Sequence, residues 1–144
     1  MKLTFHGGVR GVTGSRHLIN CNGKNVLLDC GLFQGHRRDT YELNLNFPFD
    51  PREVDAVVVS HAHMDHLGNL PNLVKKGFNG EIHCTLPTAD LAVLMLYDSA
   101  KIQEHDIDYV NARYTALYQR GHPAGDRTPA RAWFPSCLRH SPRS

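Results

Sequence analysis

The chain has 144 residues, of which 41% are hydrophobic and 21% charged, and 16 Lys and Arg against 14 Asp and Glu give a formal net charge of +2. A chain of this length forms one ordinary domain and buries roughly two thirds of the surface of its unfolded state. The near-neutral balance provides no global attraction for nucleic acid, and the apolar content excludes a wholly disordered chain.

Three short strands are expected near the N-terminus, at 3–5, 15–19 and 25–28. Asn22 and Gly23 lie between the last two strands, and both residue types tolerate a positive φ angle. This dipeptide therefore predicts a tight hairpin turn.

A buried strand and a helix are expected next. Residues 57–59 are continuously apolar and β-branched, which is typical of a central strand covered on both faces. Residues 67–76 are expected to form a helix that Gly77 ends. The side chains expected to point into the core from this helix are Leu70, Leu73 and Val74.

A short strand at 82–84 and a longer helix complete the series, with Thr88 as the expected cap of that helix. The expected inward face of the helix consists of Leu91, Leu94, Met95 and Ile102. Strands followed by alternating helices and strands indicate a mixed α/β layered domain, with helices packed on a sheet.

The N-terminal residues have no apolar run, and no segment approaches the ~18 apolar residues of a membrane span. We therefore expect a cytoplasmic protein without a membrane partner. The cysteines have no C-x-x-C spacing, so free thiols in or near a core are expected. They are Cys21, Cys30, Cys84 and Cys137.

The charge is unevenly distributed along the chain. Residues 1–110 hold ten Lys and Arg against 13 Asp and Glu, whereas residues 111–144 hold six Arg against Asp126 alone. Four of the eight prolines also lie in this last stretch, which lacks apolar periodicity. We expect a partial domain over 1–122 and an irregular, Arg/Pro-rich tail over 123–144.

Residues 60–68 follow the predicted buried strand and hold three histidines and an aspartate within six positions. Imidazole nitrogen and carboxylate oxygen are ligands that Zn²⁺ accepts at about 2.0–2.2 Å. Because positions i and i+2 of an extended segment point to the same side, His61 and His63 can hold one ion while Asp65 and His66 face a neighbouring one. Two ions about 3.5–4 Å apart can share a hydroxide nucleophile and stabilise the oxygens of a phosphate or carbonyl.

The alternative interpretation is a solvated, histidine-rich loop that happens to precede a helix. The density of histidines at the end of a strand, where α/β folds place their sites, favours metal binding. For the other histidines we expect structural roles. They include His36, in a surface loop with Arg37 and Arg38, and His83 and His105 on ordinary elements.

The H-x-H-x-D-H pattern of residues 61–66 resembles that of the metallo-β-lactamase fold hydrolases. Residues 5–8, 12–15, 28–35 and 98–100 are similar to the β-CASP, RNA-processing branch, whose members are ribonucleases and exonucleases. The resemblance implies an αββα sandwich, of which residues 1 to about 123 would form the N-terminal portion. It also implies RNA as the substrate, cleaved at a phosphodiester by metal-activated hydroxide.

The resemblance further implies roles for individual residues. His61 and His63 would bind the first Zn²⁺, and Asp65 and His66 the second, with Asp65 also acting in catalysis by orienting the attacking water. Asp29 would hold the metal loop, although an aspartate at the end of a strand also caps a turn, and both interpretations stay open.

The family completes its site with later His and Asp ligands that have no counterpart here. Gly121-His122 superficially resembles a later motif but comes too early. We interpret the chain as the N-terminal part of a hydrolase, ended by a frameshift or truncation. Whether it is itself an enzyme stays open, as does its oligomeric state. The alternatives are an ester or thioester hydrolase of the same fold and a non-catalytic, metal-binding fragment.

Overall fold

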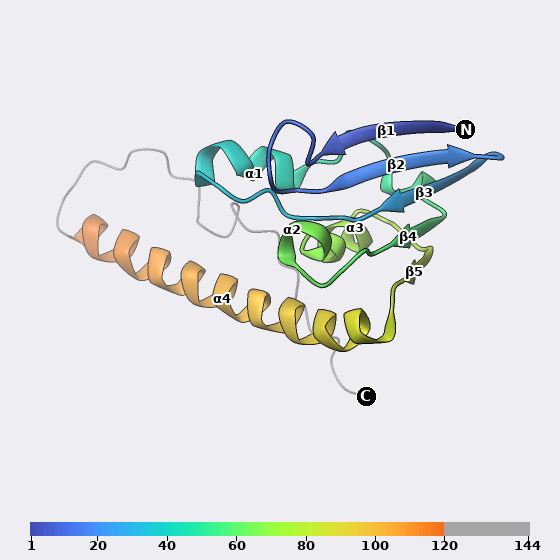
Figure 1. Cartoon of the computed structure of the whole chain (residues 1–144). Helices are drawn as coiled ribbons and strands as arrows, with labels where there is room; N and C mark the ends of the chain where they lie inside the picture. The colour runs from blue at the N-terminus through green and yellow to red at the C-terminus, as the bar shows by residue number, and fades with distance from the viewer. Residues whose placement is uncertain (120–144) are drawn as a thin grey trace. The chain divides into compact units, whose positions relative to one another are not determined.

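The computed structural model describes residues 1–119, without the side chains of 37–39 and 114–119. The chain divides into two compact units, Met1–Leu96 and a second that begins at Tyr97. The strands are β1 (Lys2–Gly7), β2 (Arg16–Cys21), β3 (Lys24–Leu28), β4 (Ala56–Val58) and β5 (Glu81–His83). The helices are α1 (Arg37–Leu45), the 3₁₀ turn η1 (Pro51–Glu53), α2 (Met64–Leu67), α3 (Leu70–Lys75) and α4 (Leu86–Gln119) (Figure 1).

The five strands form one sheet in chain order, from β1 to β5. The first three are antiparallel, and β4 and β5 join parallel to β3. The predicted hairpin turn between β2 and β3 is confirmed, because Asn22 has a φ angle of 51° and Gly23 one of 75°. Positive φ at both central residues is the conformation that matches the twist of antiparallel strands. The mixed α/β layered architecture expected from the sequence is thus observed.

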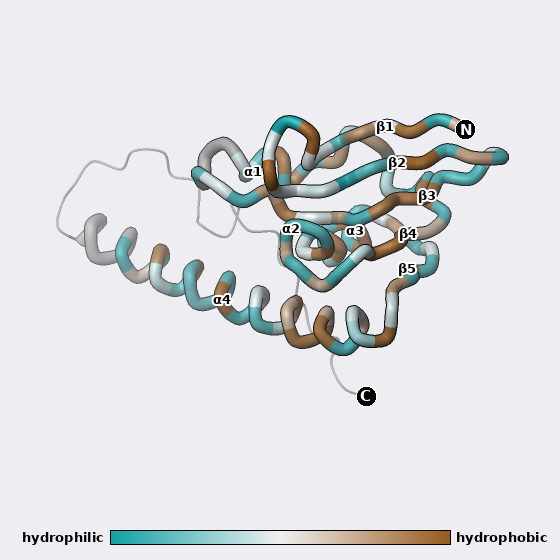
Figure 2. Tube along the Cα trace, in the orientation of Figure 1, coloured by the Kyte–Doolittle hydropathy of each residue, from teal (hydrophilic) through white to brown (hydrophobic). Residues whose placement is uncertain are grey.

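The core lies between one face of the sheet and helices α2 and α3 (Figures 1 and 2). Leu27 and Val57 point into it from neighbouring strands, and both are fully buried. Side chains alternate between the faces of a strand, so Val58 lies on the opposite face, where it is 38% exposed. The expectation that this strand is covered on both faces is therefore wrong for Val58.

The segment expected to form one helix over 67–76 belongs to two helices. The helix is interrupted between Leu67, where α2 ends, and Leu70, where α3 begins. The backbone N–H of Asn69 donates to the carbonyl oxygen of Cys30, 2.9 Å away, which ties the break to the loop after β3. Leu70 and Leu73 are buried as expected, but Val74 is 53% exposed. The apolar pattern alone did not separate Val74 from its buried neighbour, because the short α3 covers the core with only one narrow face.

Helix α4 begins two residues before the expected cap. The hydroxyl of Thr85 accepts from the backbone N–H of Thr88 at 3.4 Å, so Thr85 supplies the capping contact. Within the first unit, Ala92 and Leu96 pack against the core. The expected inward residues are instead exposed by a third to two thirds of their surface. They are Leu91, Leu94, Met95 and Ile102.

No helix is predicted over 37–45, where Arg37 and Arg38 are expected in a surface loop, and the position of α1 depends on a buried arginine. Arg16 is 1% exposed, and its guanidinium donates to the carbonyl oxygens of Leu43 at 2.9 Å and Gly31 at 2.9 Å. The guanidinium also lies over the rings of Phe33 and Phe47, 4.9 and 5.0 Å from their centroids. Burial lowers the pKa of Arg16. These contacts join α1 to β2 and to the loop after β3.

Among the described residues, no helix combines the length and the hydropathy needed to cross a bilayer. The cytoplasmic location stays a prediction. Cys30 is buried as expected, whereas Cys84 is exposed and Cys21 is half-buried. Cys137, the expected boundary at 122/123 and the tail over 123–144 lie outside the described residues.

Candidate metal centre

The histidine-rich segment lies where three parts of the chain meet. The loop after β4 leads into α2, and its backbone is bound by the loop after β3 and by the residue that precedes β2. Cys30 N–H donates to His66 O at 2.7 Å, and Leu32 N–H donates to Met64 O at 2.9 Å. Ser15 N–H donates to Asp65 O at 2.9 Å. Backbone contacts from distant segments therefore fix the path of the predicted ligands.

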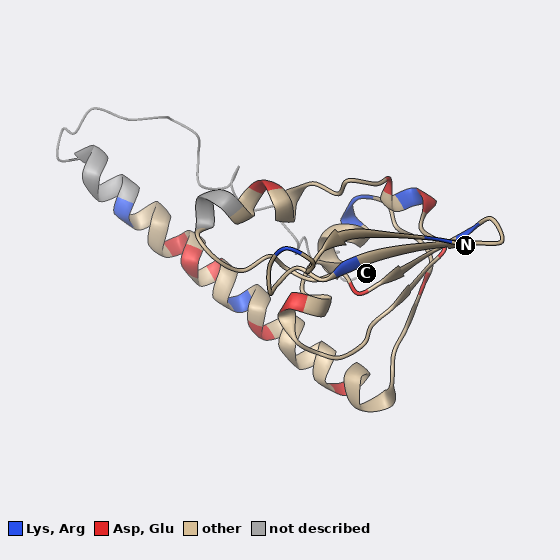
Figure 3. Cartoon of the chain, turned by 45° about the horizontal axis from the view of Figure 1, so that its top comes forward, with Lys and Arg blue, Asp and Glu red and all other residues tan. Residues whose placement is uncertain are grey.

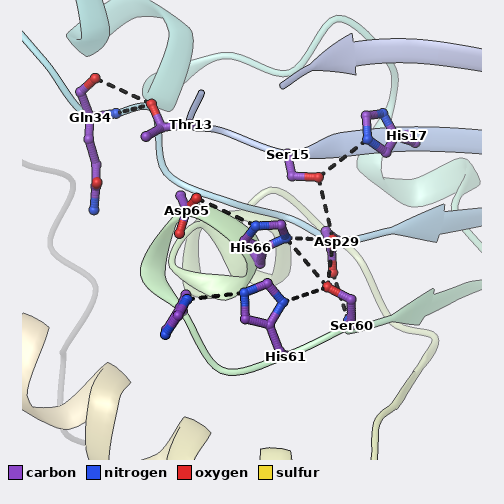
Figure 4. A network of polar contacts seen from close by, with 10 residues as sticks. Thr13, Ser15, His17, Asp29, Gln34, Ser60, His61, Asp65 and His66 are labelled. Atoms are coloured by element: carbon purple, nitrogen blue, oxygen red, sulfur yellow. Dashed lines mark hydrogen bonds and ion pairs between the residues drawn. The ribbon is translucent and has the colours of Figure 1, made fainter. Parts of the chain in front are cut away.

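The predicted ligands approach one another in two pairs, and Figure 4 shows three of them, His61, Asp65 and His66, within a larger polar network. Nε2 of His61 lies 3.1 Å from Nδ1 of His63, and Nε2 of His66 lies 3.4 Å from Oδ2 of Asp65. Two ligands of one tetrahedral zinc ion, each about 2.0–2.2 Å from the metal, are themselves about 3.3–3.5 Å apart. Both pairs have nearly this spacing, so their donor atoms suit zinc, although the same distances are those of a direct hydrogen bond and ion pair made without a metal.

The described residues contain no group of three or more His, Cys, Asp or Glu side chains arranged to hold one metal ion. Catalytic zinc sites have three protein ligands, so each pair is one ligand short. The side chains of Asp65 and His66 keep 23% and 25% of their surface exposed, which leaves the site open to solvent.

Asp29 connects the histidine-rich segment, residues 60–68, to the end of β3. It is 3% exposed and has a φ angle of 60°, a left-handed conformation at the turn after the strand. Its carboxylate accepts from the N–H of Ser60 at 2.7 Å, from the hydroxyl of Ser60 at 2.9 Å and from Nδ1 of His66 at 2.8 Å. The hydroxyl of Ser15 adds a fourth contact at 3.4 Å. Asp29 thus occupies a turn and also contacts a predicted ligand.

The other histidines that the sequence analysis named belong to neither pair. Nε2 of His83 lies 3.5 Å from a carboxylate oxygen of Glu81 on the same strand. His36 directly precedes α1, where Arg37 begins the helix in place of the expected loop. His105 lies on α4, and His122 lies outside the described residues.

The sequence interpretation did not single out Ser15 or Ser60, although both contact Asp29. The only indication in the sequence was their position at the edge of a motif, because serine has no metal-binding chemistry of its own here. Cys30 lies beside the site and is fully buried, and this burial raises the pKa of its thiol to about 12. A thiol with so high a pKa stays protonated near neutral pH in the metal-free chain.

Residues 12–130 match the family model of the Metallo-beta-lactamase superfamily. Ribonuclease TTHA0252 of Thermus thermophilus is 43% identical over 104 residues, which are 72% of this chain and 24% of that protein. Transcription termination factor FttA of Lokiarchaeum sp. is 42% identical over 102 residues, 71% of this chain and 16% of that protein. An RNase J-like protein of Methanocaldococcus jannaschii is 38% identical over 111 residues, 74% of this chain and 24% of that protein.

The chain therefore spans between 16% and 24% of the length of these relatives. Their names fit the resemblance to RNA-processing proteins stated from the motifs. Together with the family model, which covers most of the chain, they confirm that resemblance: this chain belongs to the metallo-β-lactamase superfamily, and its relatives include a ribonuclease, an RNase J-like protein and a transcription termination factor.

Proposed function

We propose that this chain supplies the zinc-binding loop of a hydrolase that cleaves RNA phosphodiester bonds. The observation that carries the proposal is the spacing of the two donor pairs, 3.1 Å between His61 and His63 and 3.4 Å between Asp65 and His66. That spacing is close to the distance between neighbouring ligands of a tetrahedral zinc ion. Imidazole nitrogen and carboxylate oxygen are ligands that zinc accepts, and here they converge twice within one short segment.

When bound, zinc ions supply a hydroxide nucleophile and positive charge for the oxygens of the attacked phosphate. His61 and His63 would hold the first ion, and Asp65 and His66 the second. Asp65 would also orient the attacking water and accept a hydrogen bond from it. Asp29 would keep the ring of His66 turned so that Nε2 faces Asp65, because Nδ1 is bonded to the Asp29 carboxylate at 2.8 Å.

Two protein ligands for each ion support binding more readily than turnover. Metal sites with fewer than three protein ligands hold zinc weakly, and catalytic sites require three. We therefore expect zinc binding by this chain to be weak, with the further ligands of a complete site lying outside the described residues. The relatives, which are several times longer, have room for them.

RNA is the proposed substrate because the similar proteins include a ribonuclease and an RNase J-like protein. Lys and Arg are spread over the described part of the chain and are interspersed with Asp and Glu (Figure 3). Electrostatic attraction by the phosphate backbone depends on clustered positive charge. We therefore expect the described part of the chain to contribute little to RNA affinity and to its salt dependence.

A second candidate is a metal-binding module without catalytic activity, which the ligand count favours. A zinc titration followed by cleavage of end-labelled RNA separates the two. Binding near two zinc ions per chain with RNA cleavage supports the hydrolase, and binding without cleavage supports the module. The double variant His61→Ala, His63→Ala tests the assignment, and His83→Ala is its matched control because His83 belongs to neither pair. Equal zinc binding by wild type and the double variant would contradict both candidates.

A further inference from the structure

The hydroxyl of Ser60 lies between a carboxylate and a predicted metal ligand. Its oxygen is 2.9 Å from Oδ2 of Asp29 and 3.0 Å from Nδ1 of His61 (Figure 4). The backbone N–H of Ser60 donates to the other oxygen of Asp29 at 2.7 Å. Two contacts to the same carboxylate therefore hold Ser60 in place and fix the direction in which its hydroxyl points.

The direction of each hydrogen bond follows from counting protons. A carboxylate only accepts hydrogen bonds, so the hydroxyl of Ser60 must donate its one proton to Asp29. Toward His61 the same oxygen can then only accept, so Nδ1 of His61 must carry a proton. A neutral imidazole has one N–H, which leaves Nε2 of His61 with a free lone pair.

His66 also carries a proton on Nδ1, through a direct contact. Its Nδ1 lies 2.8 Å from Oδ2 of Asp29 and 3.4 Å from the hydroxyl oxygen of Ser60. Nε2 of His61 lies 3.1 Å from Nδ1 of His63 and can accept a hydrogen bond from it, whereas Nε2 of His66 lies 3.4 Å from Oδ2 of Asp65. One buried carboxylate thus places a proton on Nδ1 of both histidines, for His66 directly and for His61 through Ser60.

We infer that Ser60 is a positioning residue that holds His61 with its proton on Nδ1 and its Nε2 lone pair directed toward the metal position. Without the hydroxyl, Nδ1 of His61 loses its acceptor, and the form with the proton on Nε2 becomes populated. That form places a proton where the metal would bind. The ring state is a property of the metal-free chain, and only its consequence for affinity rests on the proposed function.

The test is the protonation state of the imidazole nitrogens in the ¹⁵N-labelled, chelator-treated chain, read from long-range ¹H–¹⁵N correlation spectra at about pH 8, above the usual histidine pKa. We expect His61 of the wild type to be protonated on Nδ1. Ser60→Ala should populate the Nε2-protonated form, and Ser60→Thr, which keeps the hydroxyl, should restore the wild-type state. Ser15→Ala is the matched control, because it removes a hydroxyl from the same carboxylate without a contact to His61.

The second measurement is zinc affinity by calorimetry on the same four proteins. Loss of a residue that orients a ligand costs about 10–100-fold in metal affinity, so we expect that loss for Ser60→Ala and not for Ser60→Thr or Ser15→Ala. Nε2 protonation of His61 in the wild type overturns the inference, whatever the variants do. So does an unchanged ring state in Ser60→Ala. If the ring states follow the expectation but no protein binds zinc, the inference stands and the proposed function fails.

Discussion

Gly31 lies where the loop after β3 crosses the histidine-rich segment. Replacing it with alanine tests whether the close packing of these two segments stabilises the fold around the site. A Cβ atom at Gly31 would lie 1.6 Å from the carbonyl oxygen of Asp65 and 2.2 Å from its carbonyl carbon. Both atoms belong to the backbone, so no side chain can rotate away. Ordinary contact begins at 3.4 Å, which means that the two segments must separate by nearly 2 Å.

Such a separation breaks the hydrogen bonds on either side of Gly31. Cys30 N–H to His66 O is 2.7 Å and Leu32 N–H to Met64 O is 2.9 Å, and neither survives a shift of this size. Two lost hydrogen bonds cost about 2 kcal/mol, and overpacking adds about 1–3 kcal/mol. We expect Gly31→Ala to lower the free energy of unfolding by about 3–5 kcal/mol, a large part of the stability of a small domain.

Urea unfolding followed by circular dichroism measures the change. Gly11→Ala is the matched control, because a Cβ there would have no atom within 4 Å, and its effect should stay within about 0.5 kcal/mol. A Gly31→Ala chain with the midpoint and slope of the wild type would refute the close packing of the two segments. So would equal destabilisation by the two substitutions.

Three further predictions concern packing and thiol chemistry. Arg16→Lys should lower the free energy of unfolding by about 1–3 kcal/mol, because lysine cannot reach both carbonyl oxygens that the buried guanidinium binds. An unchanged free energy in urea unfolding would disprove that Arg16 stabilises the position of α1. Leu73→Ala should lower the free energy of unfolding by about 2–5 kcal/mol, because this side chain is fully buried. Val74→Ala should lower it by less than about 0.5 kcal/mol, because this side chain is 53% exposed. The reverse order in urea unfolding would contradict the orientation of α3. Alkylation of the native chain at about pH 8, read by peptide mass spectrometry, should label the exposed Cys84 and leave Cys30 unlabelled. Cys30 is buried, and its pKa of about 12 leaves almost no reactive thiolate. Equal labelling of the two cysteines would show that Cys30 is not buried.

The strands and their hairpin were predictable because their signals are local. Asn22 and Gly23 specify a turn with two positive φ angles, and the strands that flank them are neighbours both in sequence and in the sheet. Helix α1 has no comparable signal. Its position depends on the contact from Arg16 to Leu43, residues 27 positions apart, which no pattern within the helix reveals.

The inward face of α4 could not be read from periodicity. Apolar residues occupy several successive positions between 91 and 96, so more than one helical phase gives an apolar stripe. Ala92 and Leu96, four positions apart, pack against the core, whereas Leu91 and Leu94 are more than half exposed. The prediction selected another of these phases and left out both Ala92 and Leu96.

The predicted ligands were identifiable because they are contiguous in sequence, so that one short segment carries the whole signal. The groups that orient them come from elsewhere. Asp29 lies 31 positions before Ser60 and 37 before His66, and only the pairing of β3 with β4 brings these residues together. The hydroxyl of Ser60 acquires its role from this juxtaposition, which is why residue type and spacing gave no indication of it.

Zinc-edge X-ray absorption of the zinc-loaded chain tests the central claim most directly, because it reports the atoms bound to the metal. We predict imidazole scattering with nitrogen at about 2.0–2.1 Å from zinc, reduced in the His61→Ala, His63→Ala double variant and unchanged in His83→Ala. A spectrum dominated by sulfur at about 2.3 Å, or an imidazole signal that the double variant retains in full, would contradict the assignment of these histidines as metal ligands.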